Sequence, residues 1–140
     1  MHLVCPHCDA VNRVPEARLG EGPRCGACHA ALFEGKPVAL DAARFRHHRA
    51  KNDIPLLVDF WASWCGPCRA MAPQFEAAAK LLEPRLRLAK LSTEEAPDVA
   101  AELGVTGIPL LVLFKGGREV ARQAGAMPAR QIAAWAEAHL

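Results

Sequence analysis

Six cysteines arranged as three Cys-x-x-Cys pairs most strongly limit what this chain can fold into. In a secreted protein, so many cysteines would first indicate disulfides. Met1 is followed almost at once by polar and cysteine residues, with no basic region, apolar run or small-residue cleavage site, so we expect no secretory signal peptide. Metal binding or thiol redox chemistry in a cytoplasmic protein is therefore favoured. The pairs are Cys5/Cys8, Cys25/Cys28 and Cys65/Cys68.

Composition excludes a membrane-spanning protein and argues against a nucleic-acid-binding one. The longest uncharged apolar run has only seven residues, from Ile108 to Phe114, whereas a membrane-spanning helix needs about 20. We therefore expect no membrane span. Seventeen basic and fifteen acidic side chains leave a net charge of +2. This charge is too small to indicate nucleic acid or a membrane surface as a partner.

The composition of the chain changes near residue 37. Residues 1–37 hold four of the six cysteines and few large apolar residues. A segment this short cannot bury enough apolar surface to fold without a metal or a cross-link. From residue 38 onward, apolar strand patterns alternate with amphipathic helix patterns. We therefore predict two domains, at residues 1–37 and 38–140.

The second segment is predicted to be an α/β domain. Asp41 is a suitable N-cap for a helix that ends near Lys51. A second helix is expected from about Cys68 to Leu82, because Pro84 cannot continue it. The remaining predictions are strands at 56–61, 86–91, 110–114 and 119–123, a short helix at 97–103 and a last helix from residue 128. This order indicates a mixed central sheet with helices on both faces.

The first two cysteine pairs match a structural zinc site. Sixteen residues lie between Cys8 and Cys25, within the C-x₂-C-x₁₅₋₂₀-C-x₂-C spacing of such sites. Each pair lets one tight turn present two sulfurs, and four thiolates complete a tetrahedron around one Zn²⁺. Zinc binding then supplies the folding free energy that residues 1–37 lack. The alternatives are two disulfides or free thiols in a disordered tail. His7 and His29 are expected to be surface residues rather than ligands.

The third cysteine pair lies between a predicted strand and a predicted helix. No fourth pair is present to complete a second four-cysteine site with it. A Cys-x-x-Cys next to a β–α unit in a cytosolic protein is typical of a redox motif. The unpaired N–H groups and the positive end of the helix stabilise an anionic sulfur, which lowers the thiol pKa.

The residues around this pair resemble the thioredoxin family. The resemblance rests on Trp64-Cys65-Gly66-Pro67-Cys68 after Val58-Asp59-Phe60-Trp61-Ala62, on Gly107-Ile108-Pro109 before a strand, and on Gly125-Ala126 near the end. It covers about residues 38–140. With the cysteine-rich segment in front, the whole chain is similar to the zinc-binding thioredoxin 2 group of bacteria. The resemblance implies a thioredoxin fold preceded by a small N-terminal zinc ribbon.

The resemblance also implies a general protein disulfide reductase and a role for four residues. Cys65 is expected to be the exposed nucleophile, and Cys68 the more buried thiol that resolves the mixed disulfide. Asp59 is expected to be a buried acid that accepts the proton of Cys68, because burial raises its pKa. The alternative for Asp59 is a hydrogen-bonded structural carboxyl. Lys90 matches the family lysine near that acid, and its alternative is an exposed lysine at a strand end.

A flat apolar surface around Cys65 is expected to bind the substrate. Pro109 matches the family's cis-proline, which leaves the backbone of Ile108 available to pair with an extended substrate segment. The family commonly has threonine after this proline, where this chain has Leu110. A Leu110 side chain directed at the sulfurs would alter redox poise or substrate preference. The expected surface comprises Trp64, Gly66, Pro67, Ile108, Pro109, Gly125 and Ala126.

The resemblance further implies partners. These are disulfide-containing protein substrates and an NADPH-dependent thioredoxin reductase. We expect a monomer that binds one structural Zn²⁺ and no organic cofactor. Two other functions stay open on the sequence. One is a zinc-ribbon interaction module with the redox fold as a passenger, and the other is a sensor in which oxidation of the four N-terminal cysteines releases zinc.

Overall fold

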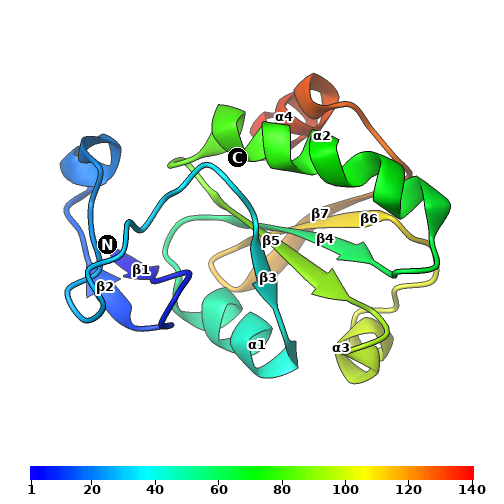
Figure 1. Cartoon of the computed structure of the whole chain (residues 1–140), viewed down its shortest axis with the longest axis horizontal. Coiled ribbons are helices and arrows are strands. Elements are labelled where there is room, and N and C mark those ends of the chain that lie inside the picture. The colour runs from blue at the N-terminus through cyan, green and yellow to red at the C-terminus, as the bar shows by residue number, and fades with distance from the viewer.

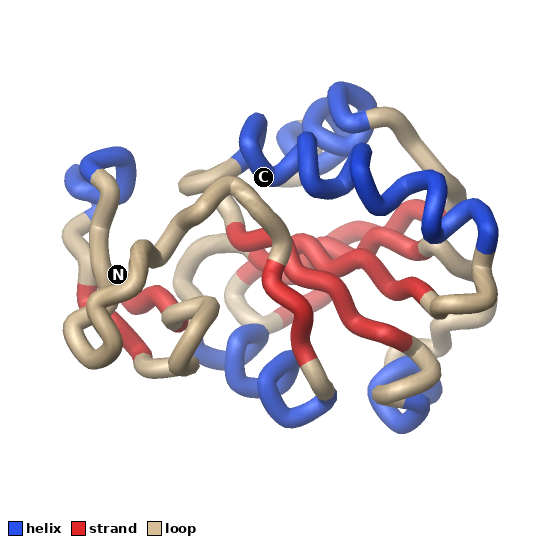
Figure 2. Tube along the Cα trace, viewed as in Figure 1, coloured by secondary structure: helices blue, strands red, loops and turns tan.

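A computed structural model describes all 140 residues (Figures 1 and 2). The N-terminal part contains a two-stranded antiparallel sheet that was not predicted from the sequence. Its strands are β1 (His2–Val4) and β2 (Val11–Arg13), and a short 3₁₀ helix, η1 (Glu16–Glu21), follows them. None of the helices in the chain combines the length and apolar character that a membrane crossing requires.

The rest of the chain forms a mixed sheet, as predicted, with five strands rather than the four expected. The strand order is β3-β5-β4-β6-β7. Strands β3, β5 and β4 are parallel, β6 is antiparallel to β4, and β7 is antiparallel to β6. The bounds are β3 (Val38–Leu40), β4 (Leu56–Trp61), β5 (Arg87–Ser92), β6 (Leu110–Lys115) and β7 (Arg118–Ala124). The predicted strands are therefore confirmed to within a residue or so.

Helices cover both faces of this sheet (Figure 1). They are α1 (Ala42–Lys51), α2 (Gly66–Leu82), α3 (Pro97–Glu102) and α4 (Ala129–Glu137). Asp41 caps α1 as predicted, because its side chain accepts a hydrogen bond from the backbone N–H of Arg44 at 2.8 Å. Helix α2 ends at Leu82, two residues before Pro84, also as predicted.

One strand was not predicted, and one helix begins slightly earlier than expected. Strand β3 was missed because it has only three residues, and its pairing with β5 joins segments some 50 residues apart. Such pairing leaves no periodic signal in the sequence. Helix α2 begins at Gly66 rather than near Cys68. The earlier start places both cysteines of the third pair at the helix N-terminus.

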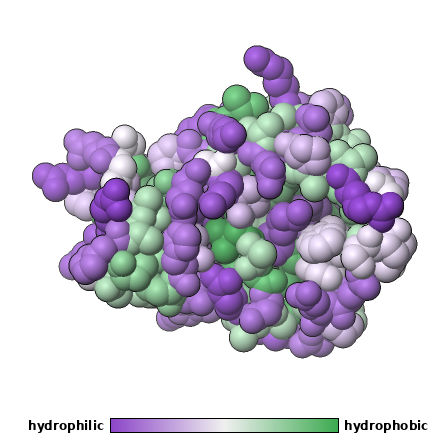
Figure 3. All heavy atoms as spheres, viewed as in Figure 1, coloured by the Kyte–Doolittle hydropathy of each residue, from purple (hydrophilic) through white to green (hydrophobic).

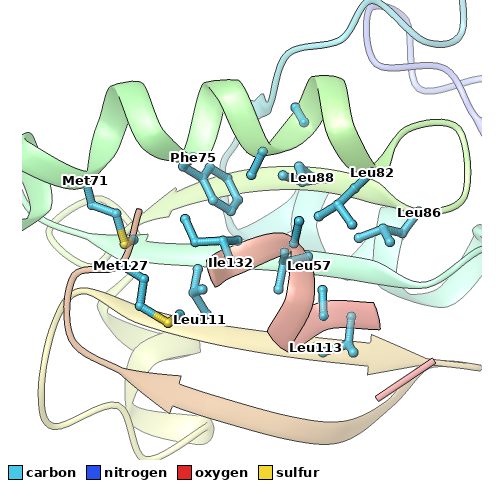
Figure 4. Close-up of a cluster of buried hydrophobic side chains, with 14 residues drawn as sticks. Leu57, Met71, Phe75, Leu82, Leu86, Leu88, Leu111, Leu113, Met127 and Ile132 are labelled. Carbon is cyan, nitrogen blue, oxygen red and sulfur yellow. The ribbon is translucent and has the colours of Figure 1, made fainter. Parts of the chain in front are cut away.

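Each face of the sheet has its own apolar core. Side chains from α2, α4 and the central strands form the larger cluster, which includes Phe75, Met127 and Ile132 (Figure 4). On the other face, Phe45 of α1 packs edge-on against Phe60 and Phe114. On the outside, hydrophilic residues are spread over both the N-terminal end and the main body of the face shown in Figure 3. The central strands β4, β5 and β6 are therefore buried on both faces, whereas the edge strand β7 is largely exposed.

A buried arginine joins the N-terminal part to the sheet. The Arg87 side chain, at the start of β5, is 1% exposed. Its guanidinium donates hydrogen bonds to the carbonyl oxygens of Val4 at 3.3 Å and Leu32 at 2.6 Å, and lies over the ring of Phe33. It also lies 3.7 Å from a carboxylate oxygen of Glu83, whose side chain is 4% exposed. Arg87 thus connects three segments that are distant in sequence.

A second junction involves Asp9, which directly follows Cys8. The Asp9 carboxylate accepts hydrogen bonds from Nε of Arg44 at 2.9 Å and 3.1 Å. His48 Nε2, from a fully buried ring on α1, lies 2.9 Å from the same carboxylate. The backbone carbonyl of Asp9 contacts His47 Nε2 at 2.7 Å. The turn that carries Cys8 is therefore fixed to α1.

We predict that Arg87→Met lowers the free energy of unfolding by about 3–5 kcal/mol, because it leaves Glu83 buried without its partner. Urea unfolding measures the change. Arg85→Met is the matched control, since Arg85 pairs with Glu137 at an exposed position, where an ion pair contributes less than about 1 kcal/mol. Equal losses of unfolding free energy in the two variants would show that the buried Arg87–Glu83 pair contributes no more than an exposed ion pair.

Candidate redox site and metal centre

Cys65 and Cys68 lie at the N-terminus of α2, directly after the central strand β4. A disulfide joins their sulfurs. Cys65 is the N-cap of α2, and its Sγ accepts a hydrogen bond from the backbone N–H of Cys68 at 3.2 Å. Pro67 stands in the first turn, where its missing N–H costs nothing. The free N–H groups and positive end of α2 therefore stabilise negative charge on the Cys65 sulfur.

Both cysteines are buried in this oxidised form. Cys65 is 5% exposed and Cys68 is 2% exposed. Cys65 is therefore the more accessible of the two, as expected, but it is less exposed than its predicted role as an exposed nucleophile implies. The bonded Cys68 sulfur covers one side of Cys65 Sγ, and the carbonyl oxygen of Ile108 lies 3.8 Å away on another.

The structure packs Ile108 against this disulfide and joins the loop of Gly125 to Pro109. The Ile108–Pro109 peptide bond is cis, as expected. The backbone N–H of Gly125 donates to the carbonyl oxygen of Pro109 at 2.9 Å, which joins the end of β7 to this loop. Trp64 is 69% exposed. Gly66, Pro67, Gly125 and Ala126 are also exposed, Ile108 is half-buried and Pro109 is buried.

Leu110, the departure from the family pattern, lies in the core. It belongs to the apolar cluster of Phe45 and Phe60 on the α1 face of the sheet. The small cluster that contains both redox cysteines has Ile108 packed against it and does not include Leu110. The Leu110 side chain is therefore not directed at the sulfurs.

Asp59 is a fully buried carboxyl on β4. Neither of its side-chain oxygens has a hydrogen-bond partner. Burial raises the pKa of Asp59 to about 7, and the nearby charge of Lys90 opposes this rise. No donor group of the protein contacts either oxygen of Asp59. The group is positioned to hold or release a proton near neutral pH.

Lys90 is the residue directly opposite Asp59 in the parallel pairing of β4 and β5. Its side chain is half-buried, and its ammonium nitrogen lies 5.0 Å from the centre of the Trp61 ring. Lys90 is therefore not an exposed lysine at the end of a strand. The strand register explains the proximity of Lys90 and Asp59, which are 31 residues apart in sequence.

The four N-terminal cysteines form a compact cluster. All four sulfurs lie within 4.8 Å of one another, with Sγ–Sγ distances of 3.6 Å for Cys5/Cys28 and for Cys8/Cys25. A tetrahedral ion with metal–sulfur bonds of about 2.3 Å needs sulfurs about 3.8 Å apart. The donor set and its spacing therefore fit a metal ion.

The backbone around Cys25 also suits an anionic sulfur. The N–H groups of Ala27 and Cys28 point to Cys25 Sγ at 3.4 Å and 3.5 Å. The Cys28 N–H and the Asn12 side chain lower the pKa of Cys25 to about 6. In both pairs the residue after the second cysteine, Asp9 or His29, has a positive φ near 65°. The two turns therefore share one geometry.

One residue of this centre was not predicted from the sequence. Asn12 donates from its side-chain nitrogen to Cys25 Sγ at 3.5 Å and accepts a hydrogen bond from the Gly26 N–H at 2.8 Å. No motif could identify it, because it stands 13 residues from Cys25. His7 is exposed and contacts Glu34, and His29 is exposed. Neither belongs to the sulfur cluster, as predicted.

Comparison with known proteins agrees with both sites. The thioredoxin family model matches residues 36–138, and the model for the N-terminal part of thioredoxin 2 matches residues 4–30. Thioredoxin C-3 of Corynebacterium nephridii is 42% identical over the whole of this chain and 96% of its own length. Thioredoxin 1 of Nostoc sp. is 42% identical over 69% of this chain and 90% of its own length.

A solved structure gives the same answer for the fold. A mutant thioredoxin from Halobacterium salinarum superposes with a TM-score of 0.68 at 29% identity, over 76% of this chain and 93% of that one. The redox pair, the cis-proline and the four-cysteine cluster are thus found where the family models match. The chain belongs to the thioredoxin family and is a thiol-disulfide oxidoreductase.

Proposed function

We propose that this chain reduces disulfides in proteins by cycling Cys65 and Cys68 between dithiol and disulfide. The observation that carries this proposal is the cysteine pair at the start of α2, with Cys65 as the N-cap and the Ile108 carbonyl beside it. The helix end favours the thiolate form, which is the form that attacks a disulfide. The exposed Trp64 and the loops around it supply an apolar surface for the substrate.

The reaction has two exchange steps. The Cys65 thiolate attacks one sulfur of the substrate disulfide, whose S–S bond breaks and releases one substrate thiolate. Cys68 then loses its proton and attacks Cys65 Sγ, which breaks the mixed disulfide and releases the second substrate thiolate. The two substrate sulfurs gain two electrons and take up protons, and the Cys65–Cys68 disulfide remains. Both steps are thiolate attacks through a mixed disulfide.

In this proposal Asp59 accepts the proton of Cys68, directly or through water. Its pKa of about 7 suits a base that works near neutral pH. No donor group of the protein occupies either oxygen, which leaves both available for this task. Lys90 acts through Asp59, because its charge favours the ionised carboxylate. Lys90 is therefore a positioning residue rather than a group that touches the substrate.

We assign residues 1–37 as a zinc ribbon and 38–140 as the thioredoxin domain. Cys5, Cys8, Cys25 and Cys28 would hold one structural Zn²⁺, since four thiolates leave no open position for catalysis. The buried contacts of Arg87 and Asp9 support a fixed placement of the ribbon on the domain. The family is generally reduced by thioredoxin reductase, and we propose an NADPH-dependent reductase as the partner of a cytoplasmic monomer.

We predict that Cys65→Ser abolishes reductase-driven reduction of a protein disulfide, because the attacking sulfur is gone. Cys68→Ser should instead accumulate a mixed disulfide with the substrate, which non-reducing gels and mass spectrometry detect. A fully active Cys65→Ser protein would disprove the assigned chemistry, and failure to trap any partner with Cys68→Ser would disprove the assigned order of the two sulfurs.

A second prediction concerns Asp59 and pH. The pKa of Asp59 is raised, so the unfolded chain releases this proton before the folded chain does. The raised pKa therefore lowers the free energy of unfolding as the pH rises. This loss is absent below about pH 4, grows up to about pH 7 and stays constant above. Asp59→Asn removes it, so the variant should exceed wild type by up to about 4 kcal/mol above pH 7, since one pKa unit corresponds to about 1.4 kcal/mol.

Urea unfolding at a series of pH values measures this difference. Asp98→Asn is the control, because Arg46 lowers the pKa of the exposed Asp98 and the sign of its contribution is opposite. Asp59→Asn should also slow the second exchange step. A stability difference that does not grow between pH 4 and pH 7 would contradict the raised pKa.

A third prediction separates the two cysteine sets. Cys5→Ser should lose zinc and retain most of the disulfide reduction, because the ribbon does not supply the reacting sulfurs. Cys65→Ser should retain about one zinc per chain and lose the reduction. Zinc content by atomic absorption and turnover are measured on the same samples. Loss of turnover in Cys5→Ser with zinc still bound would reverse the assignment.

A further inference from the structure

The loop before Cys65 is held from outside by a neighbouring loop. Ser63 lies between β4 and the redox motif. Its backbone N–H and its hydroxyl both donate to the same carboxylate oxygen of Glu94, each at 2.7 Å. Glu94 lies in the loop that follows β5, 31 residues further along the chain. These two hydrogen bonds lower the pKa of Glu94 below its usual range, so the carboxylate is ionised at neutral pH.

The segment that leads to Cys65 is held by hydrogen bonds at two further points, Trp61 and Ser63. Thr93 donates to the carbonyl oxygen of Trp61 from its backbone N–H at 2.8 Å and from its hydroxyl at 3.2 Å. The carbonyl oxygen of Ser63 accepts a hydrogen bond from Arg69 Nη1 at 2.7 Å. Arg69 directly follows Cys68 on α2, and its other terminal nitrogen lies 4.0 Å from the place where a Cβ on Gly66 would stand. Ser63 is thus fixed between Glu94 and Arg69.

We propose that Ser63, Glu94 and Arg69 form a clamp that keeps Cys65 at the N-cap of α2 once the disulfide has been reduced. This inference deepens the proposed function and rests on it. In the oxidised chain the covalent bond to Cys68 holds the Cys65 sulfur in place. After reduction that bond is gone, and the placement of Cys65 depends on the backbone before it. The three side chains are positioning residues, because they act through the backbone of Ser63.

The clamp makes an unusual prediction about charge. Glu94 is negative, so its charge alone disfavours a nearby thiolate, and removing it would lower the pKa of Cys65. Holding Cys65 against the N–H groups of α2 favours the thiolate, so loss of the clamp raises that pKa. The two effects have opposite signs. Other charged side chains of the segments that meet here are Arg69 on α2, Glu95 after β5, and Asp59 and Lys90 on the strands beneath.

The matched pair of variants is Glu94→Ala and Glu95→Ala. Each removes one exposed negative charge from the same loop, but only Glu94 contacts Ser63. The rate of alkylation of fully reduced protein by iodoacetamide is measured from pH 5 to 9. We expect Glu94→Ala to reduce the rate at pH 6.5 by on the order of fivefold, as for the loss of a charge-assisted hydrogen bond, with the inflection moved upward. Glu95→Ala should leave the rate unchanged or raise it slightly.

A second pair leaves the charge unchanged. Ser63→Ala removes the hydroxyl donor to Glu94 and should shift the profile in the same direction as Glu94→Ala, whereas Ser63→Thr restores the hydroxyl and the wild-type profile. Urea unfolding of the oxidised variants checks that the fold is intact. This pair also decides the question if Glu94→Ala does not fold.

The outcomes separate this inference from the proposed function. A wild-type profile with the inflection of an ordinary thiol would contradict Cys65 as an activated nucleophile, and with it the proposed function. A low wild-type inflection that neither Glu94→Ala nor Ser63→Ala raises would overturn the clamp alone. A downward shift in Glu94→Ala would show that Glu94 acts only through its charge.

Discussion

The burial of β4 between two neighbouring strands is the constraint on which the rest of the structure depends. Its pairing with β5 on one side and β6 on the other leaves no edge exposed, and Leu56 to Phe60 are all buried. This fixed strand delivers Cys65 to the start of α2. It also carries Asp59 into an apolar interior, where desolvation costs more than the charge of Lys90 returns. One buried strand therefore sets both the place of the sulfurs and the proton affinity beneath them.

The sequence predicted the parts of the site that lie close together along the chain. The three cysteine pairs and the helix after Cys65 all have local signals. Asp59 and Pro109 were identified through the resemblance to the thioredoxin family, and a carboxyl in an apolar strand is costly to bury. The alternation of strands and helices was enough for the fold class, because hydrophobic periodicity is a local property.

The remaining features depend on contacts between distant segments. Asn12 reaches Cys25, Arg87 reaches the carbonyl of Leu32, and Glu94 reaches Ser63 only because the sheet brings their segments together. A polar residue in such a place looks like any surface residue in the sequence. The limited exposure of Cys65 was also beyond prediction, because it arises from the Ile108 loop and from the bond to Cys68.

The attachment of the ribbon at the start of β5 has a consequence for the chemistry of sulfur in this molecule. Arg87, which contacts the ribbon, pairs with Leu56 at one end of β4, and the redox loop leaves the other end after Trp61. Six residues of strand span about 17 Å, whereas a disulfide requires Cα atoms within about 7 Å. Scrambling between the two groups of cysteines is therefore geometrically blocked in the folded chain. A redox-active cysteine pair and a four-cysteine metal site can coexist in one small polypeptide because the sheet keeps them apart.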